Sequence, residues 1–166
     1  MPSCMSRGMA MSDTVTDSEL RVSAIGLLAR REYSRAELQQ KLLRKGSVEQ
    51  VESVLDRLQN DGYQSDKRFA EVFIRNRISQ GHGEIKIRYE LRQKGITDDM
   101  VSAALQEADP DWFALALSVR ERRFPGTPSS DPKTQVKQLR HLVGRGFSYE
   151  QARYALSASD IPDFDI

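Results

Sequence analysis

The feature that most constrains the fold is a helix stop that occurs three times along the chain. Each copy has a leucine four residues before a glycine and a basic residue just before that glycine. The copies end at Gly46, Gly95 and Gly146. Glycine adopts the left-handed conformation after a helix without a Cβ clash, and the basic side chain faces the negative end of the helix dipole. We therefore expect three helices to end here, each with a left-handed glycine.

Each stop is followed by signals for a new helix. In two copies a serine stands three residues before a glutamine, the capping-box spacing in which side chain and backbone satisfy each other's donors. Thr97 has the same place in the second copy. A leucine then follows at a matching position, although the first copy is one residue shorter. A repeat of about fifty residues with these signals predicts an array of similar helical units. The serine pairs are Ser47 with Gln50 and Ser148 with Gln151, and the leucines are Leu55, Leu105 and Leu156.

Apolar spacing, caps and glycine breaks predict an all-α chain of nine helices. Because a three-helix unit is too small for a large core, we expect neighbouring units to pack in series as an elongated, curved array. The expected helices cover about 18–31, 34–46, 47–60, 66–80, 84–94, 98–108, 111–123, 132–145 and 148–157. They form repeats at 17–62, 63–109 and 110–157, with a disordered tail at 1–16 and an acidic tail at 158–166.

Several functional classes are disfavoured. No stretch approaches the ~20 apolar residues that span a bilayer, and the first residues lack the apolar core of a signal peptide. Cys4 is the single cysteine, so neither an intrachain disulfide nor a cysteine-based zinc site is expected. The only histidines, His82 and His141, lack metal-ligand spacing. The segment 81–83 lacks the lysine and hydroxyl residue of a P-loop. We expect a cytoplasmic monomer that is not an enzyme and has no metal or cofactor.

Charge is concentrated in the central repeat, although the net charge is only +1. Residues 65–96 carry eight basic and four acidic groups, against nine and nine in 1–64 and eight and eleven in 97–166. A solvated helix face is the alternative interpretation, but clustering in one repeat favours a polyanionic partner. With ~4 phosphate contacts, log K would fall with log salt by about 0.9 per contact, so binding to DNA alone would be weak.

Arg77 shares a helix face with Phe69 and Phe73, so we expect it to be half-buried and to need a carboxylate partner, for which Glu90 is the candidate. Glu90 also has the i,i+4 spacing to Lys94, which suggests a surface pair. The aromatic residues Phe69, Phe73 and Tyr89 could stack on bases. At helical spacing we expect them in the core instead, with Tyr63 over the joint between the first two repeats.

The central segment resembles the signature of the RecX family, and the similarity extends over roughly residues 18–157. Departures from the family pattern are Ser65, where an acid is common, His82, where Tyr or Lys is usual, and Glu84, where Pro is common. The resemblance rests on Gly62-Tyr63, Asp66, Arg68-Phe69-Ala70, Phe73, Arg77, Gly81, Gly83, Arg88, Glu90-Leu91 and Lys94-Gly95-Ile96.

The resemblance implies three tandem three-helix repeats that bind the RecA recombinase and its filament on single-stranded DNA. Members of the family generally repress RecA: filament growth, ATP hydrolysis, strand exchange and co-protease activity fall. No cofactor is implied, since ATP belongs to the partner. Two alternatives stay open from the residues: a stand-alone DNA-binding module of helix-turn-helix type, and a pure protein-interaction scaffold.

The candidate residues fall into two groups. Arg68 and Arg75 lie seven apart, and Arg88 and Arg92 four apart, so each pair shares a helix face. The residues expected to face the filament or single-stranded DNA are Arg68, Arg75, Lys86, Arg88, Arg92 and Lys94, extended by Arg44, Lys45, Lys137 and Arg140. Those expected to be structural are Gly62, Tyr63, Phe69, Phe73, Arg77, Glu90, Leu91 and Gly95.

Overall fold

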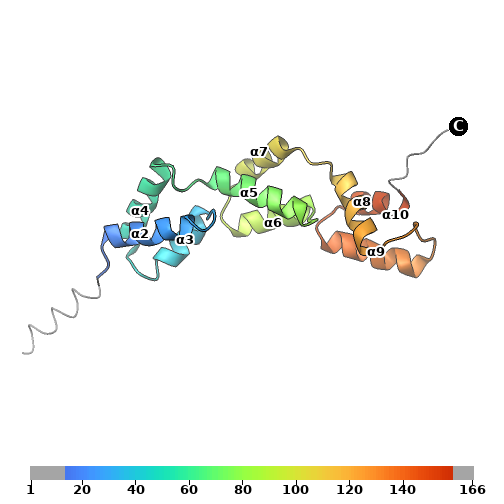
Figure 1. The fold of residues 1–166 in the computed structure, drawn as a ribbon, viewed down its shortest axis with the longest axis horizontal. Coiled ribbons are helices and arrows are strands. Elements are labelled where there is room, and N and C mark those ends of the chain that lie inside the picture. The colour runs from blue at the N-terminus through green and yellow to red at the C-terminus, as the bar shows by residue number, and fades with distance from the viewer. Residues whose placement is uncertain (1–13, 159–166) are drawn as a thin grey trace, which may run out of the picture. The chain divides into compact units, whose positions relative to one another are not determined.

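The structure is a computed structural model that describes residues 14–158; the rest of the expected tails, 1–13 and 159–166, lies outside the described residues. The described part contains nine α-helices and no strand, as the sequence predicts (Figure 1). The helices are α2 (Asp17–Leu28), α3 (Arg35–Leu42), α4 (Val48–Asn60), α5 (Asp66–Ser79), α6 (Glu84–Gln93), α7 (Asp98–Ala108), α8 (Trp112–Arg123), α9 (Pro132–Gly144) and α10 (Tyr149–Ser157).

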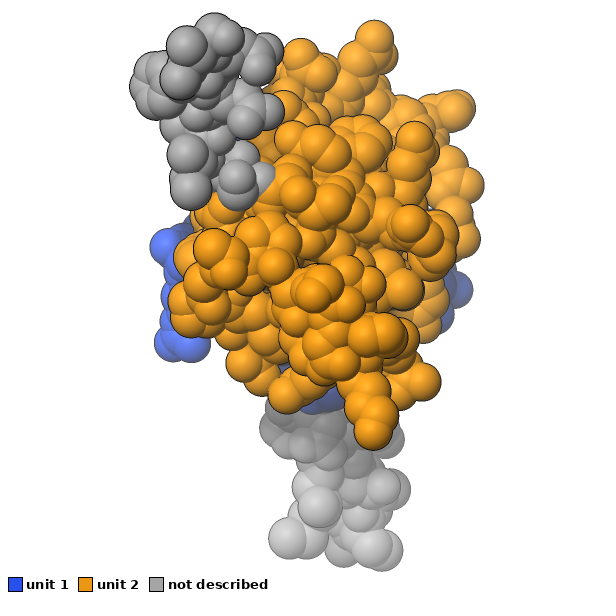
Figure 2. Space-filling model, turned by 90° about the vertical axis from the view of Figure 1, so that its right-hand side faces the viewer, with its two compact units in different colours: residues 1–69, 94–96 blue, residues 70–93, 97–166 orange. Residues whose placement is uncertain are grey.

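The chain divides into two units, coloured separately in Figure 2. The first comprises residues 1–69 and 94–96, and the second comprises residues 70–93 and 97–166. The boundary falls inside α5, so the second unit holds most of the central repeat together with the third. The elongated, curved shape stays a prediction.

Serine and threonine caps begin the helices where the sequence places them. The boxes at Ser34, Ser47 and Ser148 are complete, because each serine and the side chain three residues later satisfy each other's backbone amides. Thr97 accepts from the Met100 amide at 3.3 Å. Thr16 caps α2 in the same way, so it belongs to the first helical unit rather than to the tail.

The three helix stops share a buried leucine but differ in their glycines. Leu42, Leu91 and Leu142 are at most 1% exposed. Gly95 and Gly146 have φ of 80° and 102°, as expected. The prediction is wrong for the first stop, where Gly46 is not in the left-handed region.

Crowding explains the glycine at the first stop. A β-carbon at Gly46 would lie 2.7 Å from a methyl carbon of Leu20 on α2. In the other two repeats one more residue follows the glycine, and this residue, Ile96 or Phe147, is buried. It stands directly before the N-cap, the position of a hydrophobic staple. The single residue that the first repeat lacks is therefore this apolar side chain.

The apolar stripes form separate cores. In the first unit α2, α3 and α4 contact one another around Leu20, Leu38 and Leu58, each 0% exposed. In the second unit α10 packs on α8 and α9 around Leu142 and Phe147. Burying each leucine contributes about 1.5–3 kcal/mol. Among the described helices, none has the length and apolarity to cross a membrane.

Candidate functional site

The glycine segment 81–83 is a packing joint of the second unit. The Gly83 amide donates to the Arg145 carbonyl at 2.8 Å, and the Ile85 amide donates to the Gly146 carbonyl at 3.1 Å. A β-carbon on Gly83 would lie 2.4 Å from backbone atoms of Gly146. The start of α6 thus lies directly on the helix stop after α9. Gly83 is required here because it lets the two backbones approach closely.

Arg68 belongs to a polar network in the first unit. Its Nε lies 2.6 Å from Glu32, and its other nitrogens donate to the carbonyls of Gly62 and Tyr63 at 3.2 and 2.9 Å. The Asp66 carboxylate accepts the Arg35 amide at the start of α3 at 2.8 Å. Two of the signature residues, Asp66 and Arg68, are therefore occupied in joining the chain before α3 to the start of α5.

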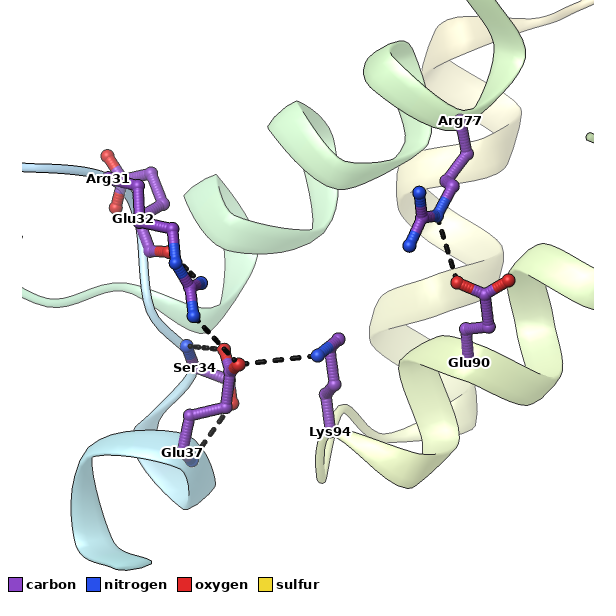
Figure 3. Close-up of polar contacts among 7 residues, drawn as sticks. All are labelled: Arg31, Glu32, Ser34, Glu37, Arg77, Glu90 and Lys94. Carbon is purple, nitrogen blue, oxygen red and sulfur yellow. Dashed lines mark hydrogen bonds and ion pairs between the residues drawn. The ribbon is translucent and has the colours of Figure 1, made fainter. Parts of the chain in front are cut away.

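Glu37 is the centre of a second network in the first unit (Figure 3). Its carboxylate lies 3.3 Å from both Arg31 and Lys94 and accepts the Ser34 amide at 3.0 Å. Burial alone would raise the pKa of Glu37, but the Ser34 amide, Arg31 and Lys94 together lower it below its ordinary value of 4.5. Lys94 is thus paired with Glu37, and the expected surface pair with Glu90 stays a prediction.

Arg77 and Glu90 form the pair that the sequence predicts, linking α5 to α6 (Figure 3). The Arg77 Nε donates to the Glu90 carboxylate at 2.9 Å, and the guanidinium carbon lies 4.8 Å from the centre of the Phe73 ring. Both side chains are partly buried, at 31% and 20% exposed. His82 lies beside them, and burial, followed by the charges of Lys86, Arg145 and Arg77, lowers its pKa. The Glu90 carboxylate opposes this shift.

The aromatic residues of the central segment separate into two sets. Phe69 is 4% exposed and Phe73 is half-buried, in accord with a core role. Tyr89 is 60% exposed, so the expected core position is wrong. Tyr63 is 46% exposed and lies under the Arg21 guanidinium, 5.4 Å from its ring centre. The Tyr63 ring is thus half-exposed and lies against Arg21 of the first unit; its position over the joint between the first two repeats stays a prediction.

The outward face of α6 combines apolar and basic side chains. Ile85 and Tyr89 are four residues apart and both about 60% exposed. Arg88 pairs with Glu84 at 3.2 Å, and Arg92 pairs with Asp98 at 3.3 Å. Arg92 and Asp98 are 62% and 72% exposed, a geometry in which an ion pair contributes little and exchanges readily for another anion. We call Ile85, Arg88, Tyr89 and Arg92 the α6 face.

The remaining predicted cations are at the surface. Arg75 is exposed and shares a shallow cleft with Glu71 and Glu107. Lys86 is half-buried, and within residues 14–158 its ammonium group has no ion pair. Lys45 donates to Ser23 at 3.0 Å. The others are exposed: Arg44 follows α3, and Lys137 and Arg140 line a groove on α9 with Lys133.

A second basic group, which was not predicted from the sequence, lies at the end of α8. Arg120 is 1% exposed and contacts Glu121 at 3.7 Å. Arg122 and Arg123 line a cleft with His141 and Arg145. Residues 120–123 contain three arginines, and this local cluster could have revealed the group. The net charge of residues 97–166 is negative and conceals the cluster. Within the described residues there is no cluster of three potential metal-ligating His, Cys, Asp or Glu side chains.

Three models of protein-family domains match successive parts of this chain. They describe the first, second and third three-helix domains of RecX, and they match residues 21–58, 65–105 and 109–156, in that order. The chain belongs to the RecX family. A protein from Chromohalobacter salexigens named "Regulatory protein RecX" is 46% identical over 138 residues, covering 82% of this chain and 90% of that protein. One of the same name from Halorhodospira halophila is 42% identical over 160 residues, 96% of each chain.

Solved structures of RecX proteins share the fold. The crystal structure of RecX from Lactobacillus salivarius matches with a TM-score of 0.72 at 22% identity, covering 84% of this chain and 94% of that one. A crystal structure of a regulatory protein RecX matches with a TM-score of 0.66 at 24% identity, covering 82% of this chain and 72% of that one. The tandem arrangement of three-helix domains predicted from the helix stops is thereby confirmed.

Proposed function

We propose that this RecX family protein regulates the RecA recombinase. It binds RecA and the RecA filament on single-stranded DNA in the cytoplasm, inhibits filament growth, and so lowers ATP hydrolysis, strand exchange and co-protease activity. The observation that carries the proposal is the match of three successive RecX domain models along the chain. Relatives that cover nearly all of this chain are named as regulatory proteins, which supports a modulator of recombination and DNA repair rather than an enzyme.

The α6 face is the surface we assign to the filament. It offers two arginines whose carboxylate partners are at least one-third exposed, so a phosphate can replace them. Tyr89 and Ile85 add exposed apolar area beside these charges. Arg68 and Lys94 contribute less, since both are held by carboxylates within the first unit. Arg75 and Lys86 extend the positive surface, and Arg44, Lys45, Lys137 and Arg140 remain the outer part of the proposed footprint.

The test is a pull-down of RecA by the full chain, with and without single-stranded DNA, combined with RecA-driven ATP hydrolysis. We expect capture of RecA, stronger capture when DNA and ATP form the filament, and ATP hydrolysis that falls as the protein is added. Tight, salt-sensitive binding to naked duplex without any capture of RecA would instead indicate a stand-alone DNA-binding module. Capture that DNA does not change would indicate a protein-interaction scaffold.

A further inference from the structure

A cleft of about 430 Å³ in the second unit is lined almost entirely by basic and polar groups. The end of α8 contributes Arg122 and Arg123, and the end of α9 contributes His141 and Arg145. No lining residue is acidic; Gln80 and Val119 complete the wall. Three guanidinium groups around one cleft repel one another unless water screens their charges or an anion neutralises them.

Two hydrogen bonds to backbone carbonyls fix the position of the Arg145 guanidinium, and no carboxylate is among these partners. Its Nε donates to the Gly81 carbonyl at 3.2 Å, and a terminal nitrogen donates to the Gln80 carbonyl. These carbonyls follow the end of α5, where the helix dipole is negative. They orient the guanidinium but neutralise little of its charge, since they carry only partial charges. Arg145 is thus a positioned cation on the wall of the cleft.

The two α8 arginines complete the positive wall. Arg122 is exposed, and within the described chain its guanidinium makes neither a hydrogen bond nor an ion pair. Arg123 packs over the Phe124 ring at 5.0 Å, and the edge of that ring meets His141 at 5.5 Å. Burial, followed by the charges of Arg123 and Arg145, lowers the pKa of His141. The positive charges of Arg123 and Arg145 thus act on the histidine as well as on the cleft.

We propose that this cleft binds the phosphodiester backbone of single-stranded DNA, as a second contact site besides the α6 face. The assignment rests on the proposed function, which supplies single-stranded DNA as the ligand. Arginine forks match phosphate oxygens in pairs. Three arginines exceed what one protein carboxylate neutralises, whereas a nucleic-acid strand carries a negative charge on every nucleotide.

The experiment uses the full chain, a fluorescent oligothymidylate and no RecA. The variant combines Arg122→Glu with Arg123→Glu. The control combines Arg30→Glu with Arg57→Glu, two exposed arginines of the first unit outside either proposed site, which lowers the net charge equally. We expect anisotropy to show at least about ten-fold weaker binding for the variant, with a salt slope reduced by about 0.7 for each lost phosphate contact. The control should bind nearly as the unsubstituted protein.

Unchanged binding of the variant, or an equal loss in the control, overturns the proposal. So does an unsubstituted protein that does not bind the oligonucleotide. If the variant melts at a lower temperature, Arg122→Gln with Arg123→Gln removes the charges without adding repulsion and is judged by the same criterion.

RecA measurements separate the proposal from the proposed function. If the unsubstituted protein inhibits RecA and the variant still binds oligothymidylate normally, the cleft proposal fails and the regulatory function stands. If the variant instead loses only capture of DNA-free RecA, the cleft serves an acidic protein surface and the proposal is overturned. If oligonucleotide binding requires Arg122 and Arg123 but RecA is not inhibited, the cleft stands and the regulatory function fails.

Discussion

Gly83 and Gly146 meet backbone to backbone, so closely that a β-carbon on Gly83 would lie 2.4 Å from the carbonyl carbon and oxygen of Gly146. Gly83 precedes α6 and Gly146 follows α9, so the contact joins the central repeat to the third. It is flanked by the hydrogen bonds from Gly83 to Arg145 and from Ile85 to Gly146. Since the proposed anion cleft includes Arg145, this joint also positions a proposed binding residue.

The first prediction concerns this joint. Gly83→Ala forces the two backbones apart, and we expect a loss of at least about 1–3 kcal/mol in the free energy of unfolding, because backbone atoms cannot rotate away as a side chain would. Urea denaturation measures it. Gly144→Ala is the matched control: nothing lies within 4 Å of a β-carbon there, and the residue is helical. The control should be neutral or slightly stabilising. Equal stability of the two variants would contradict the close packing of Gly83 on Gly146.

Local signals predicted the helices well, because caps and stops depend on residues close in sequence. Ser34 and Glu37 are three residues apart, and their box is read directly from the chain. Gly83 and Gly146 are far apart, and no periodicity reveals their contact. Gly46 shares its motif with the other stops, but its repeat is one residue shorter and the methyl groups of Leu20 leave no room for a β-carbon.

The site was harder to predict than the helices, for two physical reasons. Tyr89 is two residues from both Ile87 and Leu91, which are fully buried, so at 100° per residue it lies roughly on the opposite side of α6. The regional charge total concealed Arg122 and Arg123, because residues 97–166 carry eleven acids. None of the residues that line the cleft is acidic.

Arg77→Ala should lower the melting temperature. The change removes the 2.9 Å contact with Glu90, the 2.7 Å hydrogen bond to Gln80 and the packing on Phe73. For a pair that is partly exposed we expect a loss of about 1–2 kcal/mol, between the values for surface and buried ion pairs. A double-mutant cycle with Glu90→Gln isolates the coupling. If Arg77→Ala leaves melting unchanged yet abolishes RecA inhibition, the structural role of Arg77 is wrong.

Glu37 should make the free energy of unfolding depend on pH in the acidic range. Its pKa is lower in the folded protein than its ordinary value of 4.5, so the ionised carboxylate contributes stability above that value and loses it as pH falls through the folded pKa. Glu37→Gln should therefore be less stable than the unsubstituted protein at pH 7, and the difference should shrink below about pH 4. Urea denaturation at both pH values gives the difference. A difference that does not change with pH would contradict the role of the charge.

Removing charge tests the central footprint without disturbing the ion pairs of α6. Arg88→Glu is a poor choice, because Glu at this position would face Glu84. Arg75→Glu would likewise add a carboxylate to a cleft that holds Glu71 and Glu107. Arg75→Gln with Lys86→Gln removes both charges without adding a carboxylate, and we expect weaker inhibition of RecA-driven ATP hydrolysis with an unchanged melting temperature. Arg30→Gln with Arg57→Gln is the control for net charge. Full inhibition by the Arg75, Lys86 variant would remove these two residues from the footprint.

Tyr89 tests whether the α6 face contacts bases. An exposed tyrosine between Arg88 and Arg92 suits stacking on a single-stranded base, which contributes about 1–3 kcal/mol. Tyr89→Ala should therefore weaken binding to the filament on DNA about ten-fold, since 1.4 kcal/mol is a factor of ten. Tyr149→Ala is the matched control, because Tyr149 is 59% exposed against 60% for Tyr89 and lies on α10. Both variants should melt like the unsubstituted protein, as neither ring is buried. If the two lose equal affinity, or neither does, Tyr89 does not stack on DNA and the α6 face acts through its charges alone.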